Sequence, residues 1–281
     1  MKNPGPGKGR SGPIQNLLLA GIMVFGIGLL LYPTISNSWN ERHQSSAVAH
    51  YNDDVDKLDP EAFNALWNEA EEYNKGILKR GIEPCKLTTE EEWNYNSALN
   101  TEGNGIMGIL EIPKIHVELP IRHGSSEEVL QVSAGHLEWS SLPTGGKGNH
   151  CVISGHRGLP EARLFTDLDQ LQEGDIFILH VLDRDLYYRV DRIQTVLPAD
   201  TQALLADPAL DLCTLMTCTP YGINTHRLLV RGRAFDPAET ESVPLISSEA
   251  VLLDPEQEAF AFMSFMLVIY LIWTLRPVRK N

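Results

Sequence analysis

Residues 214–233 read TLMTCTPYGINTHRLLVRGR, and their pattern indicates two β-strands joined by a tight turn. The runs on either side are rich in Leu, Val and Thr, which favour strands, while Pro, Gly and Asn between them favour a turn. If the two strands pair antiparallel around the loop from Pro220 to His226, Cys218 and Arg227 lie side by side. The two side chains then either only pack against each other or form a reactive thiol beside a fixed positive charge.

Residues 105–236 have the same β-rich texture, with short apolar runs divided by Pro and Gly. Seven or eight such runs, with brief helices expected only around Glu127 to Val132 and Glu161 to Gln170, predict a closed β-barrel of mixed strand pairing. The runs are GIMGILEIP, HVELPIRHG, GNHCVISGH, DIFILHVLD, LYYRVDRIQTVLP, LCTLMTCT and RLLVRGRAF.

Residues 40–104 predict a helical region ahead of the barrel. One helix is expected to begin at Asp59 and Pro60 and to end at the glycines Gly76 and Gly81. A second short helix is expected to open with a capping box formed by Thr89 and Glu92. The connecting loop between the two helices contains RGIEPCKLT.

The charge distribution predicts a membrane protein with an acidic exported segment. All 37 acidic residues lie between Trp39 and Ala259, whereas six of the 23 basic residues lie outside that span. The net negative charge of this segment argues against nucleic acid as a partner, because phosphate binding needs a basic surface. Apolar runs at residues 16–35 and 259–275 predict two transmembrane helices.

Basic tails at residues 1–15 and 276–281 flank the two apolar runs, so both termini are expected to be cytoplasmic. The acidic segment between the two runs is then expected to be extracellular, and residues 237–258 are expected to form a linker back to the membrane. A cleaved signal peptide is the alternative interpretation of the first run, and a buried core helix is the alternative for the second.

The four cysteines, Cys85, Cys151, Cys213 and Cys218, lack the dense spacing of a disulfide scaffold. Cys213 and Cys218 are five positions apart, so in a strand they point to opposite faces and cannot easily bond each other. At least one free thiol is therefore expected.

A thiol, a fixed positive charge and a proton carrier form a candidate catalytic set. A cysteine is nucleophilic to the extent that it is a thiolate, which a nearby charge such as Arg227 favours. The guanidinium also offers rigid donors for a carbonyl that becomes an oxyanion. His156 is the preferred proton carrier, because it ends the apolar run CVISGH and opens a turn that places it at a barrel rim.

Each candidate also has a structural alternative. Cys218 could be a small buried hydrophobe, Arg227 a surface ion pair and His156 a turn residue bonded to backbone. His226 is the second choice for the proton carrier, although its position next to Arg227 makes it face the opposite way. Surface or packing roles are expected for the histidines His116, His123, His136, His150 and His180.

TLMTCTPYGINTHRLLVRGR and ISGHRGLPEARLFTDLDQLQEGD resemble signature segments of the sortases, specifically of class C, the pilin polymerases of Gram-positive bacteria. GILEIPKIHVELPIRHGSSEEVL and GHLEWSSLPTGGKGNH are similar to the same class, so the resemblance spans Gly105 to Phe235. The two-span topology resembles that class as well. The resemblance implies an eight-stranded barrel whose catalytic His, Cys and Arg map onto His156, Cys218 and Arg227.

The resemblance also implies an activity. Sortases cleave an LPXTG-like sorting signal between Thr and Gly, hold the acyl group as a thioester and pass it to an amine, which in class C is a lysine of another pilin subunit. The sequence contains no convincing metal motif, and no cofactor is expected. The alternatives are a sortase that anchors proteins to peptidoglycan, a membrane-tethered pilus scaffold without catalysis, and a cysteine protease, for which no Asn or Asp partner of His156 is identifiable.

One departure from the family concerns a lid. Class C sortases carry an Asp-Pro-aromatic motif whose acid pairs with the catalytic arginine, and this chain has Glu83-Pro84-Cys85 at that place. The resemblance therefore implies a lid in which Glu83 pairs with Arg227. Cys85 suggests a reversible disulfide with Cys218, with an ordinary loop thiol as the alternative.

Overall fold

The computed structural model describes residues 13–80, 86–101 and 103–239. These residues divide into two compact units, and the described parts of the units are residues 13–36 and residues 37–239. The larger unit contains every strand of the described chain.

Eight strands of the larger unit close into a barrel in the order β1-β2-β3-β4-β7-β8-β6-β5. The strands are β1 (Ile106–Ile112), β2 (Val117–His123), β3 (Ala134–His136), β4 (His150–Ser154), β5 (Ile176–Val181), β6 (Arg184–Val196), β7 (Leu212–Thr219) and β8 (His226–Ala234). Two contacts, β2 with β3 and β4 with β7, are parallel and the others are antiparallel. The predicted closed barrel of mixed pairing is confirmed.

Strand β3 is the element of the barrel that the sequence pattern missed. Its three residues are too short for a recognisable alternation, and they form a strand because they pair with β2 on one side and β4 on the other. Side chains pack the barrel interior densely, and the rings of Phe177 and Tyr188 stack there with centroids 5.5 Å apart. A Cβ atom on Gly232 would lie 2.6 Å from the Phe177 ring, so a glycine is required at that position.

The helices are α1 (Pro13–Val55), α2 (Pro60–Arg80), α3 (Thr89–Ser97) and the short α4 (Glu127–Leu130). The 3-10 helices are η1 (Pro113–Ile115), η2 (Leu168–Gln170), η3 (Gln202–Leu204) and η4 (Pro237–Glu239). The expected helix near Glu127 is confirmed. The one expected over Glu161 to Gln170 is wrong except for the single turn η2, because the preceding residues form an irregular loop.

The predicted start of the second helix is confirmed, since α3 begins at Thr89, but the predicted capping pair is wrong, and Gly76 does not end α2. The capping box of α3 uses Thr88 and Glu91, with Glu91 Oε2 accepting from the Thr88 amide at 2.8 Å. The run of two Thr and three Glu offers two registers, and the structure uses the first, in which the Thr88 hydroxyl accepts from the Glu91 amide at 3.3 Å. Helix α2 continues through Gly76 to Arg80, because Asn74 and Ile77 on either side are held in buried contacts.

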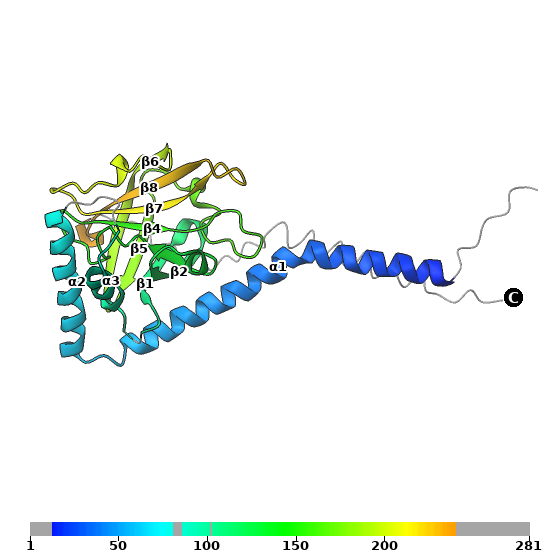
Figure 1. Cartoon of the computed structure of the whole chain (residues 1–281), viewed down its shortest axis with the longest axis horizontal. Helices are drawn as coiled ribbons and strands as arrows, with labels where there is room; N and C mark the ends of the chain where they lie inside the picture. Colours follow the sequence, from blue (N-terminus) through cyan, green and yellow to red (C-terminus); the bar gives the residue numbers. More distant parts are fainter. Residues whose placement is uncertain (1–12, 81–85, 102, 240–281) are drawn as a thin grey trace, which may run out of the picture. The chain divides into compact units, whose positions relative to one another are not determined.

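Helices α2 and α3 lie along one side of the barrel (Figure 1). Asn74 Nδ2 donates to the backbone oxygen of Leu142 at 3.0 Å, and Asn74 Oδ1 accepts from the Leu142 amide at 2.7 Å. Tyr95 of α3 inserts its hydroxyl between the Gly124 amide, at 2.8 Å, and Nδ1 of the buried His136, at 3.0 Å. These buried polar contacts fix both helices to the barrel.

Helix α1 contains the predicted first membrane span. Among the described residues, one stretch, Gly21–Val55, is long and apolar enough to cross a membrane. The helix does not end near residue 35, where the span was expected to end, but runs unbroken to Val55. The second predicted span, residues 259–275, lies outside the described residues.

The C-terminal part of α1 belongs to the larger unit and packs on β1. Val48 and Tyr51 are buried against Ile106 and Ile109. The Tyr51 hydroxyl accepts from the Leu182 amide at 2.8 Å. This end of α1 is therefore part of the barrel's own packing.

His150 is a buried histidine that holds the long β6–β7 connection. Nδ1 lies 3.0 Å from the backbone oxygen of Leu205, which only accepts, so Nδ1 carries the proton. Nε2 lies 2.7 Å from the Thr214 hydroxyl and accepts from it. Burial lowers the pKa of His150 to about 4, although the hydrogen bond to Leu205 opposes that effect.

The buried His150 predicts a loss of stability in acid. Its pKa in the folded chain is below the unfolded value of about 6.5, so protonation favours the unfolded state. We expect the unfolding free energy to fall by on the order of 3 kcal/mol between about pH 6.5 and about pH 4, and His150→Gln to lack this part of the slope. Denaturant unfolding at several pH values measures both slopes, and equal slopes in the two proteins would contradict the prediction.

Candidate active site

Cys218 and Arg227 face each other across strands β7 and β8. Their Cα atoms are direct partners in the antiparallel register. The side chain of Cys218 is partly exposed, whereas its strand neighbour Thr217 is buried, as the alternation of a strand requires. The pairing expected from residues 214–233 is confirmed.

The turn between these strands is held by its own backbone. The amides of Ile223 and Asn224 both donate to the backbone oxygen of Pro220 at 3.0 Å. Asn224 has a φ of 60°, a left-handed conformation that Asn tolerates well. Arg227 Nη1 then donates to the backbone oxygen of His226 at 3.2 Å, which restrains the guanidinium at the start of β8.

His156 leaves the barrel from the strand on the other side of β7. Strand β4 runs parallel to β7 with Ser154 opposite Met216, and the Gly155 amide donates to the Met216 oxygen at 3.0 Å. His156 is two residues beyond Ser154, and Cys218 is two residues beyond Met216. Strands β4, β7 and β8 are neighbours in the barrel (Figure 1). The register therefore places the three predicted residues at the same end of these strands.

Two contacts fix the chain where it turns at His156. The Thr217 hydroxyl donates to the Gly155 oxygen at 2.7 Å, and the Phe165 amide donates to the His156 oxygen at 3.0 Å. The Phe165 ring lies so close that a Cβ atom on Gly155 would be 2.7 Å from it. Glycine at 155 thus permits the loop to fold back over the end of β4.

Glu127 of α4 is a neighbour of His156 that sequence reasoning missed. Both carboxylate oxygens lie 3.3 Å from His156 Nε2. The two residues are 29 positions apart on different elements, so no local spacing signals the contact. The capped start of α4, where the Ser126 hydroxyl accepts from the Val129 amide at 3.4 Å, places Glu127 at the first helical position.

Cys151 and Cys213 are also free thiols, but they lie inside the barrel. They are opposite each other on the parallel pair β4 and β7, and both are buried. Burial raises the pKa of Cys213 well above its usual value, which keeps it protonated. The prediction that Cys213 and Cys218 point to opposite faces is confirmed.

The other histidines have structural surroundings. His226, the second choice, pairs with Thr219 at the start of β8, and its Nδ1 lies 2.9 Å from the Thr225 hydroxyl. His123 lies against the backbone oxygens of Gly105 and Ala98, and its burial lowers its pKa. Packing roles are confirmed for the buried His136 and His150.

The lid residues Glu83 and Cys85 lie outside the described residues, so their contacts with Arg227 and Cys218 stay predictions. Within residues 13–80, 86–101 and 103–239, no group of three or more His, Cys, Asp or Glu side chains is arranged to hold a metal ion.

The arrangement defines a class of site: a partly exposed thiol, a guanidinium and an imidazole at one rim of a closed β-barrel. These groups suit acyl transfer through a covalent intermediate, because they supply a nucleophile, a donor for an oxyanion and a proton carrier.

Comparison with known proteins identifies the family. A sortase domain profile matches residues 110–235. The chain is 47% identical to sortase C1 from Streptococcus agalactiae, with a TM-score of 0.66 over 68% of this chain and 98% of that one. It is 39% identical to the sortase C of Streptococcus pneumoniae, with a TM-score of 0.59 over 68% of this chain and 97% of that one.

Two further relatives extend the comparison. A structure of Clostridium perfringens sortase C with the C-terminal cell wall sorting motif is 38% identical, with a TM-score of 0.60 over 68% of this chain and 99% of that one. Sortase A of Bacillus anthracis is 30% identical over 45% of this chain, which spans 59% of that relative's length. This chain belongs to the sortase family, and its structural neighbours include class C sortases. Sortases are cysteine transpeptidases.

The burial of the three described thiols predicts their reactivity. In the folded full chain, a maleimide should modify Cys218 and leave Cys151 and Cys213 unmodified, because only Cys218 is partly exposed. Peptide mass spectrometry after brief labelling measures each site separately, and labelling in denaturant is the control in which all three react. Early modification of Cys151 or Cys213 would contradict the buried placement.

Proposed function

We propose that this chain is a membrane-anchored pilin polymerase of class C in which Cys218, His156 and Arg227 are the catalytic residues. The observation that carries the proposal is the strand register: Cys218 is the direct partner of Arg227, and the chain turns at His156 at the same end of the adjacent strand β4. The resemblance of both signature segments to the family supports the same assignment.

The reaction follows from the chemistry of these groups. The Cys218 thiolate attacks the Thr carbonyl carbon of the Thr–Gly peptide bond in an LPXTG-like sorting signal. Arg227 donates hydrogen bonds to the oxygen of that carbonyl as it becomes negative. His156 protonates the departing amine of Gly, which leaves a thioester on Cys218. The lysine amine of another pilin subunit then attacks the thioester and loses a proton to His156. The new amide retains the bond energy of the old one, so no external energy source is required.

The pilin specificity rests on the structural neighbours. The S. pneumoniae structure is described in terms of pilin substrate specificity, and the C. perfringens one contains a cell wall sorting motif. We infer that the substrates of this chain are likewise pilins that carry LPXTG-like signals, with a lysine of a second subunit as acceptor.

Membrane anchoring fits this function. An enzyme and a substrate that share one membrane meet at a raised effective concentration. The apolar stretch Gly21–Val55 and the basic tails support a topology with both termini cytoplasmic and the barrel outside the cell. On protoplasts, a membrane-impermeant maleimide should then label Cys218, and protection of Cys218 until lysis would contradict this topology.

Replacement of the catalytic residues tests the assignment. With a purified full chain and an LPXTG-type peptide, Cys218→Ala should abolish cleavage, and Arg227→Ala should lower kcat about 10²- to 10³-fold, the usual loss when an oxyanion donor is removed. Arg233→Ala is the matched control, because Arg233 is an exposed arginine on the same strand. Undiminished turnover in Cys218→Ala would remove the nucleophile assignment.

The product distinguishes pilin polymerisation from peptidoglycan anchoring. A pilin with its sorting signal should give a ladder of covalent oligomers with the active chain, and none when its lysines are blocked by methylation. A single product linked to a cell wall amine would favour the anchoring sortase instead. Failure to trap any thioester would favour a scaffold without catalysis.

The proposed lid predicts a change in thiol reactivity. If Glu83 pairs with Arg227 and covers the site, Glu83→Ala should speed alkylation of Cys218, whereas Glu90→Ala on the exposed face of α3 should not. Stopped-time labelling measures the two rates, and identical rates would count against the lid. Intact mass without reductant tests the disulfide between Cys85 and Cys218, which lowers the mass by two hydrogens.

A further inference from the structure

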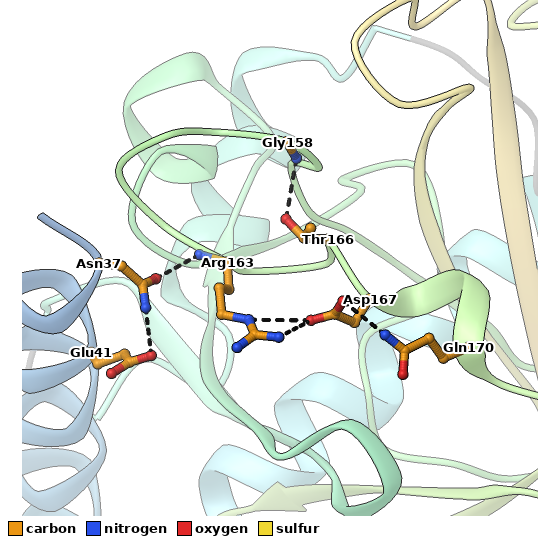
Figure 2. Close-up of polar contacts among 7 residues, drawn as sticks. All are labelled: Asn37, Glu41, Gly158, Arg163, Thr166, Asp167 and Gln170. Atoms are coloured by element: carbon orange, nitrogen blue, oxygen red, sulfur yellow. Dashed lines mark hydrogen bonds and ion pairs between the residues drawn. The ribbon is translucent and has the colours of Figure 1, made fainter. Parts of the chain in front are cut away.

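The C-terminal part of α1 carries a row of amide side chains that contacts the loop after His156. Asn37 Oδ1 accepts from the Arg163 amide at 2.9 Å, as Figure 2 shows. One turn further on, Asn40 Nδ2 donates to the Glu161 backbone oxygen at 2.8 Å. The partners fix both amide orientations, because a backbone amide only donates and a carbonyl only accepts. Two side chains of α1 thus hold two backbone groups of this loop, on residues two positions apart.

The loop that Asn37 and Asn40 hold is hydrogen-bonded to the backbone of the proposed catalytic histidine, His156. The Phe165 amide donates to the His156 oxygen at 3.0 Å, and the Gly158 amide donates to the Thr166 hydroxyl at 3.2 Å. Within the loop, the Arg163 guanidinium forms an ion pair with Asp167 at 2.8 Å (Figure 2). A displacement of residues 161–163 would therefore shift His156 as well, because these hydrogen bonds and this ion pair link the two parts of the loop.

A third amide of α1, that of Gln44, contacts the segment after α4, the helix that carries Glu127. Gln44 Nε2 donates at 3.1 Å to the backbone oxygen of Val132, which follows α4. Helix α4 carries Glu127, whose carboxylate lies 3.3 Å from His156 Nε2. The same helix thus contacts the segments that supply the imidazole and its carboxylate neighbour.

The three amides lie on one stripe of α1. Residues 37, 40 and 44 have the i, i+3, i+7 spacing of a single helix face, and Val48 and Tyr51 continue that face. The latter two are buried against β1. The apolar part of the stripe therefore attaches α1 to the barrel, and the polar part extends along it to the His156 loop and α4.

We propose that Asn37, Asn40 and Gln44 form an amide clamp that positions His156 for proton transfer at Cys218. This inference rests on the proposed function, since it concerns the same site. The three amides are positioning residues: they do not touch the substrate, but they hold the backbone that carries the imidazole and its carboxylate neighbour. Residues 37–44 of α1, which belong to the same unit as the barrel, thereby become part of the catalytic site's support.

Alanine substitutions test the clamp in the full chain. Alanine forms helices better than Asn or Gln, so α1 should persist in the variants. Because displacement of a catalytic group by about 1 Å costs up to about 10²-fold, we expect the triple variant Asn37→Ala, Asn40→Ala, Gln44→Ala to lose about tenfold or more in kcat with little change in KM. Arg42→Ala, an exposed position of the same helix, is the matched control and should be unaffected.

Variants that move or add a carboxylate distinguish a positioning role of these amides from a general effect on folding. Asn37 Nδ2 donates to Glu41 Oε1 at 2.7 Å, so N37D/E41Q exchanges the amide and the carboxylate while an acceptor stays in place for the Arg163 amide. This double variant should retain kcat within about twofold of the wild type. N40D replaces a donor with a carboxylate facing the Glu161 oxygen, so its kcat should fall as in N40A.

The outcomes distinguish the clamp from the proposed function. An inactive wild-type chain would overturn the proposed function, whatever the variants do. An active wild type with the alanine variants and N40D all within about twofold of it would overturn the clamp alone. Equal losses in Arg42→Ala and in the triple variant would also overturn it, because the effect would then be a general one. Melting temperatures of the variants near the wild-type value confirm that the folded chain was measured.

Discussion

The structure depends on the position of β7 between a parallel and an antiparallel neighbour. Its pairing with β8 sets Cys218 against Arg227, and its pairing with β4 sets Ser154 against Met216. The hydrogen-bond ladders on both sides leave no freedom for a shift of one residue, since such a shift would move Cys218 to the barrel interior and Thr217 to the surface. One register therefore decides both which thiol is accessible and which charge lies beside it.

His156 has a different kind of support, because it follows β4 rather than lying within it. Its backbone is held by the Phe165 amide, and Gly155 before it gives the space for the Phe165 ring. Its side chain meets the Glu127 carboxylate from α4. The imidazole thus depends on loop and helix contacts, whereas the thiol and the guanidinium depend on strand pairing.

The helices ahead of the barrel are joined to it by buried polar contacts as well as by apolar packing. Asn74 satisfies the backbone of Leu142, and Tyr95 reaches the buried His136. Such contacts are specific in direction, because an unpaired buried polar group is costly. They orient α2 and α3, which flank the segment that contains Glu83 and Cys85. The placement of any lid on this barrel starts from those two anchored helices.

The sequence alone determined the features that contiguous residues encode. The strand, turn and strand of residues 214–233 indicated the Cys218 and Arg227 pair, and the apolar run near the N-terminus indicated a long apolar helix. The tertiary structure alone decided the parallel contact of β4 with β7, the existence of β3 and the approach of Glu127 to His156. It also decided the amide row of α1, whose Asn37 meets a partner 126 positions away. These contacts join segments that are distant along the chain. Strand pairing in the barrel and the packing of α1 on β1 bring those segments together, and a local pattern has no means to encode that distance.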